Sequence, residues 1–392
     1  MSKKVYIVLH TMDVGGAERH ASSIANYLAE HGYRVTIILL DNDVVAYQLS
    51  ENVRVAALCN MEFPETIREY RPGVLTSAKL KLYKALSPQR YQVLDKYLYL
   101  YSRYISRLET FFANEQGAEE SIAISFMPLP NLSCAAVKRK IHFKLILGEF
   151  SSPQVEFPAD APENRLKREL FPNVDGFVFQ TEEQMAFYDY LPAVKKAVIP
   201  NPLEEIDVQP YEGVRNREIV NFCRLVEAKN LPLLIRAFSL LAPQYPEHRL
   251  VIYGDGPEKQ KLEEMIEGLG LSSRVMLPGA KKDVLSLVRE CAMFVSSSDR
   301  EGISNSMLEA MAIGLPTVCT DCPAGGARMF IEPYRNGILV PVRDQEALAA
   351  AMRYMIDYPE EAAEMGKNAV SIKEKLKKEI ILEKWKSFLE SV

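Results

Sequence analysis

Short apolar runs alternate with amphipathic segments along most of the chain. At the start, Val5–Leu9 is apolar, Glu18–Glu30 carries apolar residues at helical spacing, and Arg34–Leu40 is apolar again. This order predicts a strand, a helix and a second parallel strand. The same pattern predicts later strands at Ser121–Phe126, Lys144–Leu147, Gly176–Gln180 and Ala197–Ile199, with a helix beginning at Thr181.

The segment Pro200-Asn201-Pro202 interrupts this pattern, because two prolines around an asparagine break both helix and strand. A second α/β series follows. Its predicted strands are Ile219–Phe222, Arg249–Tyr253, Arg274–Leu277, Met293–Ser296 and Thr317–Thr320, and its predicted helices are Leu231–Leu241, Pro257–Leu269, Ser306–Ile313 and Glu346–Tyr354. The chain therefore predicts two Rossmann-like, doubly wound α/β domains that face a cleft.

We place the first domain at residues 1–202 and the second at residues 203–375. Residues 376–392 predict a C-terminal helix, a candidate for packing back on the first domain. The 392 residues are enough for two large cores without disulfides or metals. The N-terminal apolar run predicts a first strand and not a signal peptide, and no apolar run approaches the ~18 residues of a membrane span.

Charge and cysteine content narrow the class of protein. Lys and Arg total 47 and Asp and Glu total 52, giving a formal net charge of −5. This balance excludes a broad electrostatic footprint for nucleic acid, and we expect no nucleic-acid partner. Six cysteines are too few for a disulfide scaffold and favour the reducing cytoplasm.

Residues 61–112 differ from the rest and predict a helical insertion. Their tyrosines are Tyr70, Tyr83, Tyr91, Tyr97, Tyr99, Tyr101 and Tyr104. Between residues 79 and 107 the basic side chains are Lys79, Lys81, Lys84, Arg90, Lys96, Arg103 and Arg107, and the acid is Asp95. Basic, aromatic helices of this kind lie on anionic membrane surfaces. The alternative is a solvated helical hairpin with a tyrosine-lined core.

The strongest candidate for chemistry is the segment from Glu301 to Glu309, EGISNSMLE. The first glutamate follows a predicted strand, and the second lies inside the next helix. Both carboxylates can line one elongated ligand and accept hydrogen bonds from sugar hydroxyls. The amides of Ile303, Ser304 and Asn305 stand at the helix N-terminus, where they can bind phosphate. The alternative is a helix with an acidic start.

Arg224 and Lys229 follow another strand of the second domain, five residues apart. Two cations beyond a strand end can neutralise a diphosphate, both when it binds and when it leaves; the alternative is a surface pair. Gly254-Asp-Gly256 also follows a strand, but the third glycine position of a dinucleotide fingerprint holds Lys259. Gly15-Gly16 in the first strand-to-helix loop lets backbone approach a phosphate or sugar closely.

Taken together, these segments resemble family four of the retaining glycosyltransferases, the glycosyl transferases group 1, with GT-B architecture. The resemblance covers nearly the whole chain and is clearest in the C-terminal half. The matching segments are GGAER at 15–19, PNP at 200–202, FCRLVEAKN at 222–230, IYGDGP at 252–257, RVMLPG at 274–279 and SSSDREGISNSMLEAMAIGLPTV at 296–318.

The resemblance implies roles for the matched positions. Glu301 would lie beside the donor sugar as a catalytic residue, and Glu309 would bind the donor ribose. Arg224 and Lys229 would hold the diphosphate and stabilise it as the leaving group, with Gly16 approaching from the other domain.

Other matched positions would complete the donor site. Gly254 and the Arg274–Gly279 stretch, including Gly279, would border the nucleotide base. Gly302, Ile303, Ser304 and Asn305 would line the donor next to Glu301. The family needs no divalent ion, so the resemblance implies no metal site and no cofactor beyond the nucleotide sugar.

The chain departs from the family pattern at two places. Cys223 stands where a glycine usually precedes the arginine, which bears on the local backbone. In the first domain, the loop after the strand at 144–147 keeps Glu149 but has Phe150 where relatives have arginine. We assign Glu149 to the acceptor side as a catalytic candidate; the alternative is a helix-capping or surface acid.

Several other residues suggest chemistry but have ordinary explanations. Asp41-Asn42-Asp43 has metal-binding spacing, yet it follows the second strand of a βαβ unit and predicts a polar turn. Cys319 and Cys322 have zinc or redox spacing without a second pair or a histidine cluster. Gly325-Gly326 could border the donor. His10 ends the first strand, where a cleft residue or a packed histidine fits equally.

The resemblance implies a metal-independent, retaining glycosyltransferase, and we expect its donor to be a UDP-hexose or UDP-N-acetylhexosamine. The basic, tyrosine-rich segment favours a glycan or lipid-linked acceptor in surface polysaccharide synthesis, with the protein peripheral at the inner face of the cell membrane. Two alternatives remain: a sugar-nucleotide epimerase of the same fold, and a catalytically silent scaffold at a membrane. An NAD-dependent enzyme is disfavoured because the glycine fingerprint is incomplete.

Overall fold

The structure is a computed structural model, and it describes residues 3–60, 87–115, 117–150, 153 and 160–392. The chain divides into two compact units. Unit 1 comprises Met1–Ile199 and Ile381–Val392, and unit 2 comprises Pro200–Ile380. The division falls three residues before the predicted boundary at 202, and most of the C-terminal helix belongs to unit 1. The two units are described separately below.

Unit 1 is built on a parallel sheet of seven described strands in the order β3-β2-β1-β4-β5-β6-β7. The strands are β1 (Lys4–Leu9), β2 (Arg34–Leu39), β3 (Val53–Ala57), β4 (Ile122–Phe126), β5 (Lys144–Glu149), β6 (Gly176–Phe179) and β7 (Lys195–Val198). The central strands are buried along nearly their whole length, because helices cover both faces of a parallel sheet.

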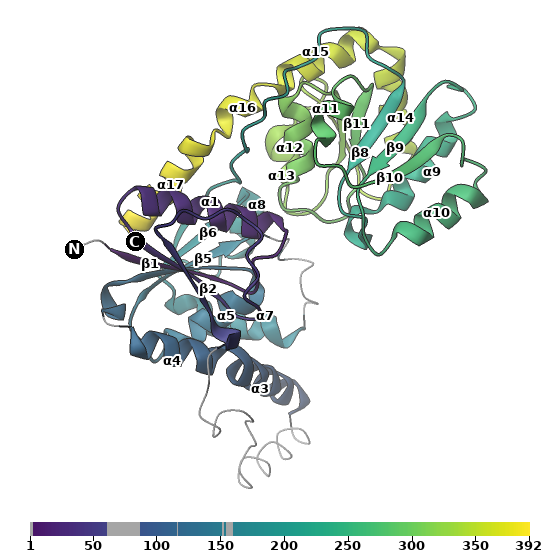
Figure 1. Cartoon of the computed structure of the whole chain (residues 1–392). Coiled ribbons are helices and arrows are strands. Elements are labelled where there is room, and N and C mark those ends of the chain that lie inside the picture. The colour runs from purple at the N-terminus through teal and green to yellow at the C-terminus, as the bar shows by residue number, and fades with distance from the viewer. Residues whose placement is uncertain (1–2, 61–86, 116, 151–152, 154–159) are drawn as a thin grey trace. The chain divides into compact units, whose positions relative to one another are not determined.

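Helices cover the two faces of this sheet, with α1 on one face and α4 and α5 on the other (Figure 1). The helical elements of unit 1 are α1 (Gly16–Glu30), η1 (Leu58–Asn60), α3 (Pro88–Leu100), the π-helical turn η3 (Tyr101–Ile105), α4 (Ser106–Asn114), η4 (Ala118–Glu120), α5 (Pro128–Val137), α7 (Pro162–Leu170), η5 (Phe171–Asn173), α8 (Glu182–Phe187) and α17 (Lys378–Ser391). Thr181 caps α8 with a complete capping box, at the helix start that the sequence predicts.

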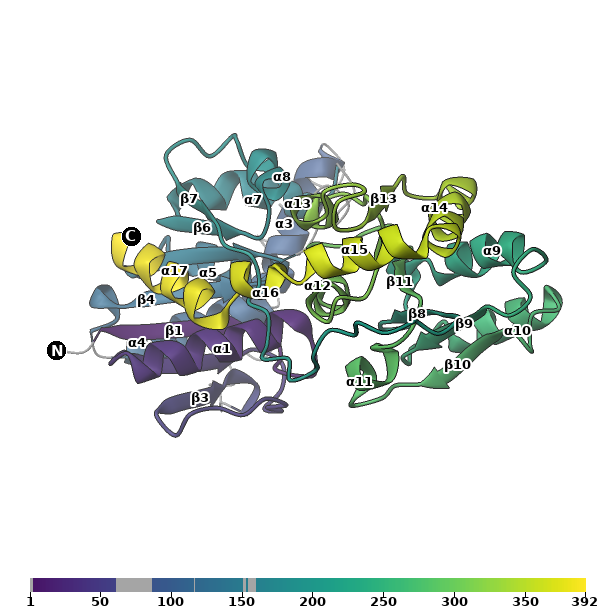
Figure 2. The same cartoon turned by 90° about the horizontal axis from the view of Figure 1, so that it is seen from above.

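The C-terminal helix α17 packs beside α1, as Figure 2 shows from above. The fully buried Trp385 lies 5.6 Å from His20 of α1 and 5.6 Å from Phe126 at the end of β4, measured between ring centroids. Tyr27 and Tyr33 donate hydrogen bonds to two glutamates of α17. The last twelve residues therefore complete the core of unit 1 although they follow unit 2 in the sequence.

Unit 2 repeats the plan with a parallel sheet in the order β10-β9-β8-β11-β12-β13 among its described strands. The strands are β8 (Glu218–Phe222), β9 (Arg249–Tyr253), β10 (Val275–Gly279), β11 (Met293–Ser296), β12 (Thr317–Thr320) and β13 (Ile338–Val340). The helical elements are η6 (Glu227–Lys229), α9 (Leu231–Leu241), α10 (Lys259–Gly268), α11 (Val284–Val288), α12 (Asn305–Ala312), α13 (Gly326–Phe330), α14 (Gln345–Asp357), α15 (Pro359–Ala369) and α16 (Ile372–Lys375).

The prediction of two doubly wound α/β domains is confirmed, and two strands escaped it. β3 has the sequence VRVAA, in which Arg54 interrupts the apolar run, and it lies at the edge of its sheet half exposed. β13 has three residues, too few to show a pattern, and also lies at an edge. Within the described residues, no helix is long and apolar enough to span a bilayer.

Both strand orders reverse direction at one point. In unit 1 the order reverses between β1 and β4, and in unit 2 between β8 and β11. In open α/β sheets, ligands bind outside the carboxyl ends of the strands at such a switch point. The fold therefore marks one place in each unit where a ligand is expected.

Candidate functional site

The switch point of unit 2 brings together residues that the sequence separates by 72 positions. Lys229 follows β8 and Glu301 follows β11, and the Lys229 ammonium donates a hydrogen bond to Glu301 Oε2 at 2.5 Å. Their side chains are only 17% and 20% exposed. The structure thus pairs two of the predicted catalytic residues at the carboxyl edge of the sheet.

The Lys229–Glu301 pair and its burial determine the protonation of Lys229 and of the nearby Cys223. Burial opposes the ammonium charge of Lys229, but the charge and the hydrogen bond of Glu301 outweigh it, so the pKa of Lys229 lies above its ordinary value. Burial raises the pKa of the neighbouring Cys223 thiol to about 12. Lys229 therefore stays cationic and Cys223 stays a neutral thiol at physiological pH.

Backbone contacts fix the loop that carries Lys229. Ser297 Oγ donates to the Lys229 carbonyl at 3.0 Å, and the Asp299 amide donates to the Ala228 carbonyl at 2.9 Å. Asn230, at a left-handed φ of 41°, donates from its side chain to Asp299 at 2.9 Å. The loops after β8 and β11 therefore hold each other in place. Sequence reasoning missed Asp299 and Asn230, although Asp299 lies in the matched segment at 296–318.

Two glycines let neighbouring loops approach more closely than a side chain allows. Gly254 has φ of 144°, and a Cβ there would lie 1.8 Å from the carbonyl oxygen of Cys223. Its amide donates to the carbonyl of Gly279 at 3.1 Å. Gly256 is similar, since its Cβ would lie 2.4 Å from the Leu225 carbonyl oxygen. Packing between the loops at the strand ends thus accounts for both glycines of the Gly254-Asp-Gly256 segment.

The departure at Cys223 leaves the backbone ordinary. Cys223 is not among the residues with positive φ, so its backbone does not call for a glycine. The following residue, Arg224, is exposed directly after β8, and no described residue forms an ion pair or hydrogen bond with its guanidinium. Arg224 therefore presents a second positive charge on the same loop as Lys229.

The segment after Glu301 forms the start of α12. Ser304 is the N-cap, and its hydroxyl accepts from the Met307 amide at 3.4 Å. Ile303 is buried, which anchors the turn, and Asn305 Oδ1 accepts a 3.5 Å hydrogen bond from Asn201 of the PNP segment. Glu309 is half buried on α12.

Gly326 packs against the same turn from the other side. A Cβ on Gly326 would lie 1.8 Å from the carbonyl oxygen of Gly302. Gly325, the N-cap of α13, has φ of 71°. This pair of glycines therefore supports the turn between Glu301 and α12 through backbone packing.

The two remaining predicted residues, Gly16 and Glu149, belong to unit 1. Gly16 is the first residue of α1, and the backbone of its neighbour Gly15 exchanges two hydrogen bonds with the Tyr47 hydroxyl. Glu149 ends β5 and is 3% exposed, which excludes a surface acid. It accepts a 2.7 Å hydrogen bond from Tyr188, whose hydroxyl also accepts one from the buried Lys167 at 3.3 Å.

Cys319 and Cys322 are free thiols, and burial raises the pKa of Cys322 to about 12. Burial raises the pKa of Cys319 as well. In the described part of the chain, no group of three or more His, Cys, Asp and Glu side chains could hold a metal ion. The thiols behave as small apolar groups in the core of unit 2.

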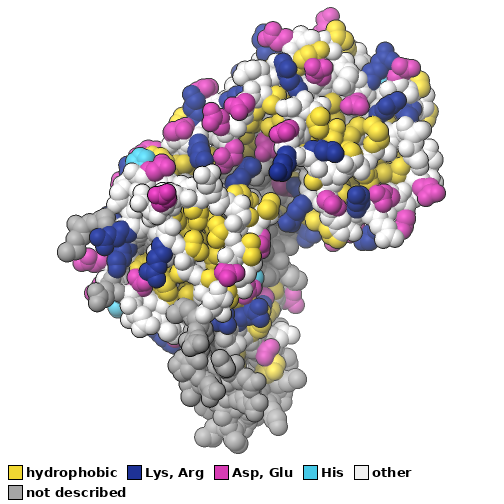
Figure 3. Space-filling view, viewed as in Figure 1, with side chains coloured by type: hydrophobic (Ala, Val, Ile, Leu, Met, Phe, Trp, Pro, Cys, Tyr) yellow, Lys and Arg dark blue, Asp and Glu magenta, His cyan; other side chains and the backbone are white. Residues whose placement is uncertain are grey.

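Much of the predicted basic, tyrosine-rich insertion, residues 61–86, lies outside the described residues. In the described part, Lys96 pairs with Glu163 at 2.9 Å, and Arg103 pairs with Asp41 at 3.5 Å. Tyr104 is buried and Tyr99 is 45% exposed. In the described part, one tyrosine of the insertion is therefore buried and another is exposed. On the face shown in Figure 3, basic and acidic side chains are interspersed.

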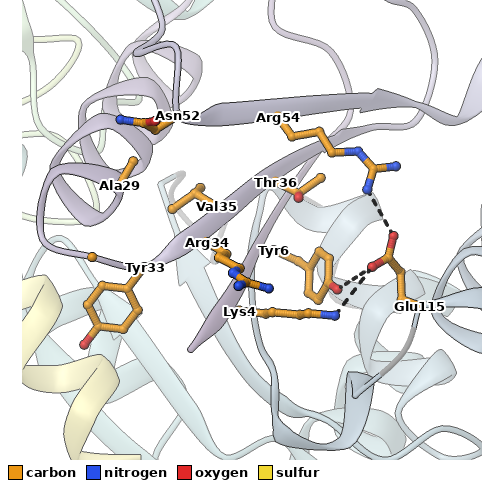
Figure 4. Close-up of a pocket in the computed structure, with 11 residues that line it drawn as sticks. Lys4, Tyr6, Ala29, Tyr33, Arg34, Val35, Thr36, Asn52, Arg54 and Glu115 are labelled. Atoms are coloured by element: carbon orange, nitrogen blue, oxygen red, sulfur yellow. Dashed lines mark hydrogen bonds and ion pairs between the residues drawn. The ribbon is translucent and has the colours of Figure 1, made fainter. Parts of the chain in front are cut away.

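A cavity of about 610 Å³ lies at the amino ends of β1, β2 and β3 (Figure 4). Glu115 stands on its wall and accepts a hydrogen bond from Tyr6 at 3.1 Å and one from Arg54 at 3.3 Å, with Lys4 4.0 Å away. None of the predicted site residues lines this cavity. It lies at the edge opposite to the one where parallel sheets bind ligands.

Comparisons with known proteins show what the chain is similar to. Residues 204–371 match the family described as Glycosyl transferases group 1. The chain is 24% identical, over 99% of its length and 100% of the relative, to an uncharacterized glycosyltransferase of Haemophilus influenzae. It is 25% identical, over 91% of its length and 90% of the relative, to an N-acetylgalactosaminyltransferase of Campylobacter jejuni that acts on a diphospho-undecaprenol-linked saccharide.

Solved structures share the fold over the whole length. Anabaena HepE in complex with UDP superposes with a TM-score of 0.75 at 18% identity, covering 100% of both chains. Staphylococcus aureus TarM gives the same TM-score at 17% identity, covering 99% of both chains. At such identities the likeness is one of fold, and it places both units in the GT-B architecture.

Proposed function

We propose that this chain, a glycosyltransferase whose residues 204–371 form a domain of the glycosyl transferases group 1 family, transfers a hexose or N-acetylhexosamine from a UDP-sugar. The acceptor is a hydroxyl of a glycan or lipid-linked saccharide in surface polysaccharide synthesis. The reaction retains the anomeric configuration and needs no divalent metal. The observation that carries the proposal is the partly buried Lys229–Glu301 pair at the switch point of unit 2, with the exposed Arg224 on the same loop as Lys229.

The chemistry of these groups suits a nucleotide-sugar donor. Bond cleavage at the anomeric carbon leaves its electron pair on the diphosphate, and Arg224 and Lys229 supply positive charge for that anion. The N-terminus of α12, with eight residues, adds amide donors at Ser304 and Asn305. The carboxylates of Glu301 and Glu309 accept hydrogen bonds from the sugar and ribose hydroxyls.

What similar proteins bind and act on supports our choice of UDP as the nucleotide and of a lipid-linked saccharide as the acceptor. HepE is known with UDP and with UDP-glucose, and TarM with UDP. Two Campylobacter jejuni relatives are transferases of N-acetylgalactosamine to diphospho-undecaprenol saccharides. We extend the nucleotide and the acceptor class to this chain, and we leave the individual sugar to experiment.

A thermal-shift panel in EDTA tests the donor. UDP, GDP, ADP and several UDP-sugars are compared on the wild type, on Lys229→Ala and Glu309→Ala, and on the matched control Lys367→Ala, an exposed lysine of α15. At ~100 times its dissociation constant, a ligand adds ~2.7 kcal/mol of stability. We expect a shift with uridine compounds alone, lost in the first two variants and kept in the control. No shift with any nucleotide would favour the silent scaffold.

Product analysis tests the reaction. With a UDP-sugar that shifts the transition, the protein in EDTA is incubated with extracted lipid-linked saccharides, and the new glycosidic bond is examined by NMR. Retention predicts the same anomeric configuration in product and donor. An inverted product, or turnover only after addition of a divalent ion, contradicts the mechanism; a changed nucleotide sugar without acceptor indicates an epimerase.

We also propose peripheral contact with an anionic membrane through residues 79–107, on the strength of their basic and aromatic composition. Flotation with vesicles containing anionic lipid measures it directly. We expect binding that weakens with salt and is lost on deletion of residues 79–86, the stretch that carries three of the lysines. Equal flotation of the wild type and the deletion variant would remove this part of the proposal.

A further inference from the structure

Four polar side chains meet at the carboxyl edge of the unit 1 sheet, and none of them belongs to the donor site. His10 directly follows β1, Asp41 lies two residues after β2, and Arg103 and Tyr104 belong to the π-helical turn η3. β1 is the strand at which the order of the unit 1 sheet reverses. The cluster therefore lies next to the switch point of unit 1, on the β2 side of β1, at the edge of the sheet where ligands bind. π-Helical turns also occur frequently at functional sites.

The contacts within the cluster converge on one ring nitrogen. His10 Nε2 lies 3.0 Å from Asp41 Oδ2 and 2.9 Å from the Tyr104 hydroxyl oxygen. The Tyr104 hydroxyl lies 3.4 Å from the same Asp41 oxygen and accepts a 3.1 Å hydrogen bond from Arg103 Nε. The sequence predicts Asp41 as part of a polar turn, whereas the structure makes it the partner of His10.

In a neutral imidazole, these contacts favour one of the two tautomers. A carboxylate only accepts hydrogen bonds, so the short contact with Asp41 requires a proton on Nε2. Tyr104 then donates to Asp41 as well. Burial and the charge of Asp41 raise the pKa of Tyr104 to about 12, so its hydroxyl keeps the proton that it donates. Nδ1 is left with its lone pair.

The ring is held firmly yet remains accessible. Tyr104 is 1% exposed and the Asp41 side chain is 20% exposed, whereas the His10 side chain is 35% exposed. No hydrogen bond joins Nδ1 to any residue that the structure describes. The buried Tyr104 and the partly buried Asp41 thus orient a hydrogen-bond acceptor that no described residue uses.

We propose that His10 binds the acceptor saccharide, with Nδ1 accepting a hydrogen bond from one of its hydroxyl groups, while Asp41 and Tyr104 position the ring. The inference rests on the proposed transferase function. It assigns unit 1 a polyhydroxylated ligand, separate from the nucleotide sugar of unit 2. The competing explanation is a pair that only braces the loops after β1 and β2.

Nitrogen NMR of protein labelled with ¹⁵N-histidine tests the assignment of the proton. The chain has five histidines, so the spectrum is simple, and His10→Gln identifies the signals of His10. We expect the neutral ring to carry its proton on Nε2 in the wild type and to lose this preference in Asp41→Asn. A proton on Nδ1 in the wild type would overturn the proposal.

Steady-state kinetics distinguish a His10 that binds the acceptor from a His10 that only holds the loops after β1 and β2 together. Gln at position 10 keeps a donor near Nε2 and lacks an acceptor at the Nδ1 position, whereas Asn keeps one there. With the active donor and acceptor, we expect His10→Gln to raise the acceptor KM about tenfold, the effect of ~1.4 kcal/mol. The donor KM and the UDP thermal shift should stay unchanged, and His10→Asn should recover part of the loss.

The exposed His142 supplies the matched control as His142→Gln. An unchanged acceptor KM in His10→Gln, or an equal rise in the control, would overturn the proposal. If the wild type turns over no UDP-sugar, the proposed function fails, and the ligand of His10 is decided by titration with N-acetylgalactosamine. A change confined to the Nδ1 signal of His10 then supports the inference, and an unaffected His10 rejects it.

Discussion

The carboxyl edges of the two sheets are held together by different means. In unit 2, backbone packs on backbone: Gly254 lies against the carbonyl of Cys223, and Gly326 lies against that of Gly302. A side chain at either glycine would collide with a carbonyl oxygen at 1.8 Å. The positions of the loops after β8, β9 and β11 thus depend on glycines that lack a Cβ.

In unit 1, contacts between side chains hold the loops at the carboxyl edge in position. His10, Asp41 and Tyr104 connect the loops after β1 and β2 to the π-helical turn, and exposed apolar residues surround the loops, with Val14 81% and Val44 49% exposed. A Cβ at Gly15, Gly32, Gly117, Gly148 or Gly176 of unit 1 would have no backbone atom within 2.0 Å.

The difference matches the two kinds of ligand proposed. A site defined by backbone packing has little freedom to change, which suits the constant part of a donor, a nucleoside diphosphate. A site defined by a few side chains can change its specificity without moving the loops, which suits an acceptor. Substitutions at the two edges should therefore differ both in size and in kind.

The largest effect is expected where unit 2 provides charge. Lys229→Met should lower kcat/KM for transfer by 10²–10³, about 2.7–4 kcal/mol, because the leaving diphosphate loses a cation and Glu301 loses its partner. Steady-state kinetics measure this, with Lys367→Met as control. Activity within threefold of wild type would show that the Lys229–Glu301 pair is structural. The unit 2 edge would then have no assigned role in binding the diphosphate.

Gly254→Ala probes the backbone packing itself. The Cβ would collide with the Cys223 carbonyl at a φ of 144°, so we expect a loss of about 3 kcal/mol in the free energy of unfolding and weaker UDP binding. Gly270→Ala is the matched control, since Gly270 has φ of 67° but nothing within 4 Å of the Cβ position. It should cost only about 1 kcal/mol. Equal losses in denaturant titrations would show that strain, not packing, accounts for Gly254.

The sequence was sufficient for the fold and for the candidate residues at the carboxyl edge of the unit 2 sheet, because both depend on local patterns. Buried parallel strands are continuous apolar runs, and the charged and glycine residues of unit 2 lie directly after them. Edge strands gave no such signal: Arg54 interrupts β3, and β13 is three residues long.

The cluster of unit 1 was not predictable in the same way. His10, Asp41 and Tyr104 lie in three segments up to 94 residues apart, and each has an ordinary explanation by itself. Asp41 lies in a polar turn, and Tyr104 lies among other tyrosines. Only the tertiary structure brings them together, because the π-helical turn belongs to the insertion whose position the βαβ pattern does not determine.

Acid should lower the free energy of unfolding of unit 1 through the protonation of one buried histidine, His20. His20 of α1 is fully buried among Phe126, Phe150 and Trp385, and burial lowers its pKa to about 3. Between pH 6.5 and 3 the unfolded chain therefore binds one proton more than the folded chain. The contribution to stability is complete above pH 6.5 and is lost as the pH falls, by about 2 kcal/mol at pH 5.

His20→Leu should remove this loss. We expect the free energy of unfolding of unit 1, followed by Trp385 fluorescence, to fall less steeply with acid in the variant than in the wild type, by one proton in slope. Trp385 is the chain's single tryptophan and belongs to unit 1, so the signal reports that unit. Parallel curves for the two proteins would mean that His20 is protonated in the folded state.

The smallest effects belong to two exposed arginines, each paired with an aspartate that follows a strand of its sheet. Arg343 pairs with Asp299 at 2.9 Å in unit 2, and Arg103 pairs with Asp41 at 3.5 Å in unit 1, with the arginine side chains 74% and 52% exposed. Because exposed pairs contribute at most about 1 kcal/mol, either change to alanine should alter the free energy of unfolding by about 0.5 kcal/mol or less. Asp299 keeps its hydrogen bond from Asn230, and Asp41 keeps its contact with His10.

If Arg103→Ala cost much more than Arg343→Ala in denaturant titrations at equal salt, the unit 1 edge would depend on its arginine for stability. The ring of His10 would then be held less independently than the comparison of the two edges requires.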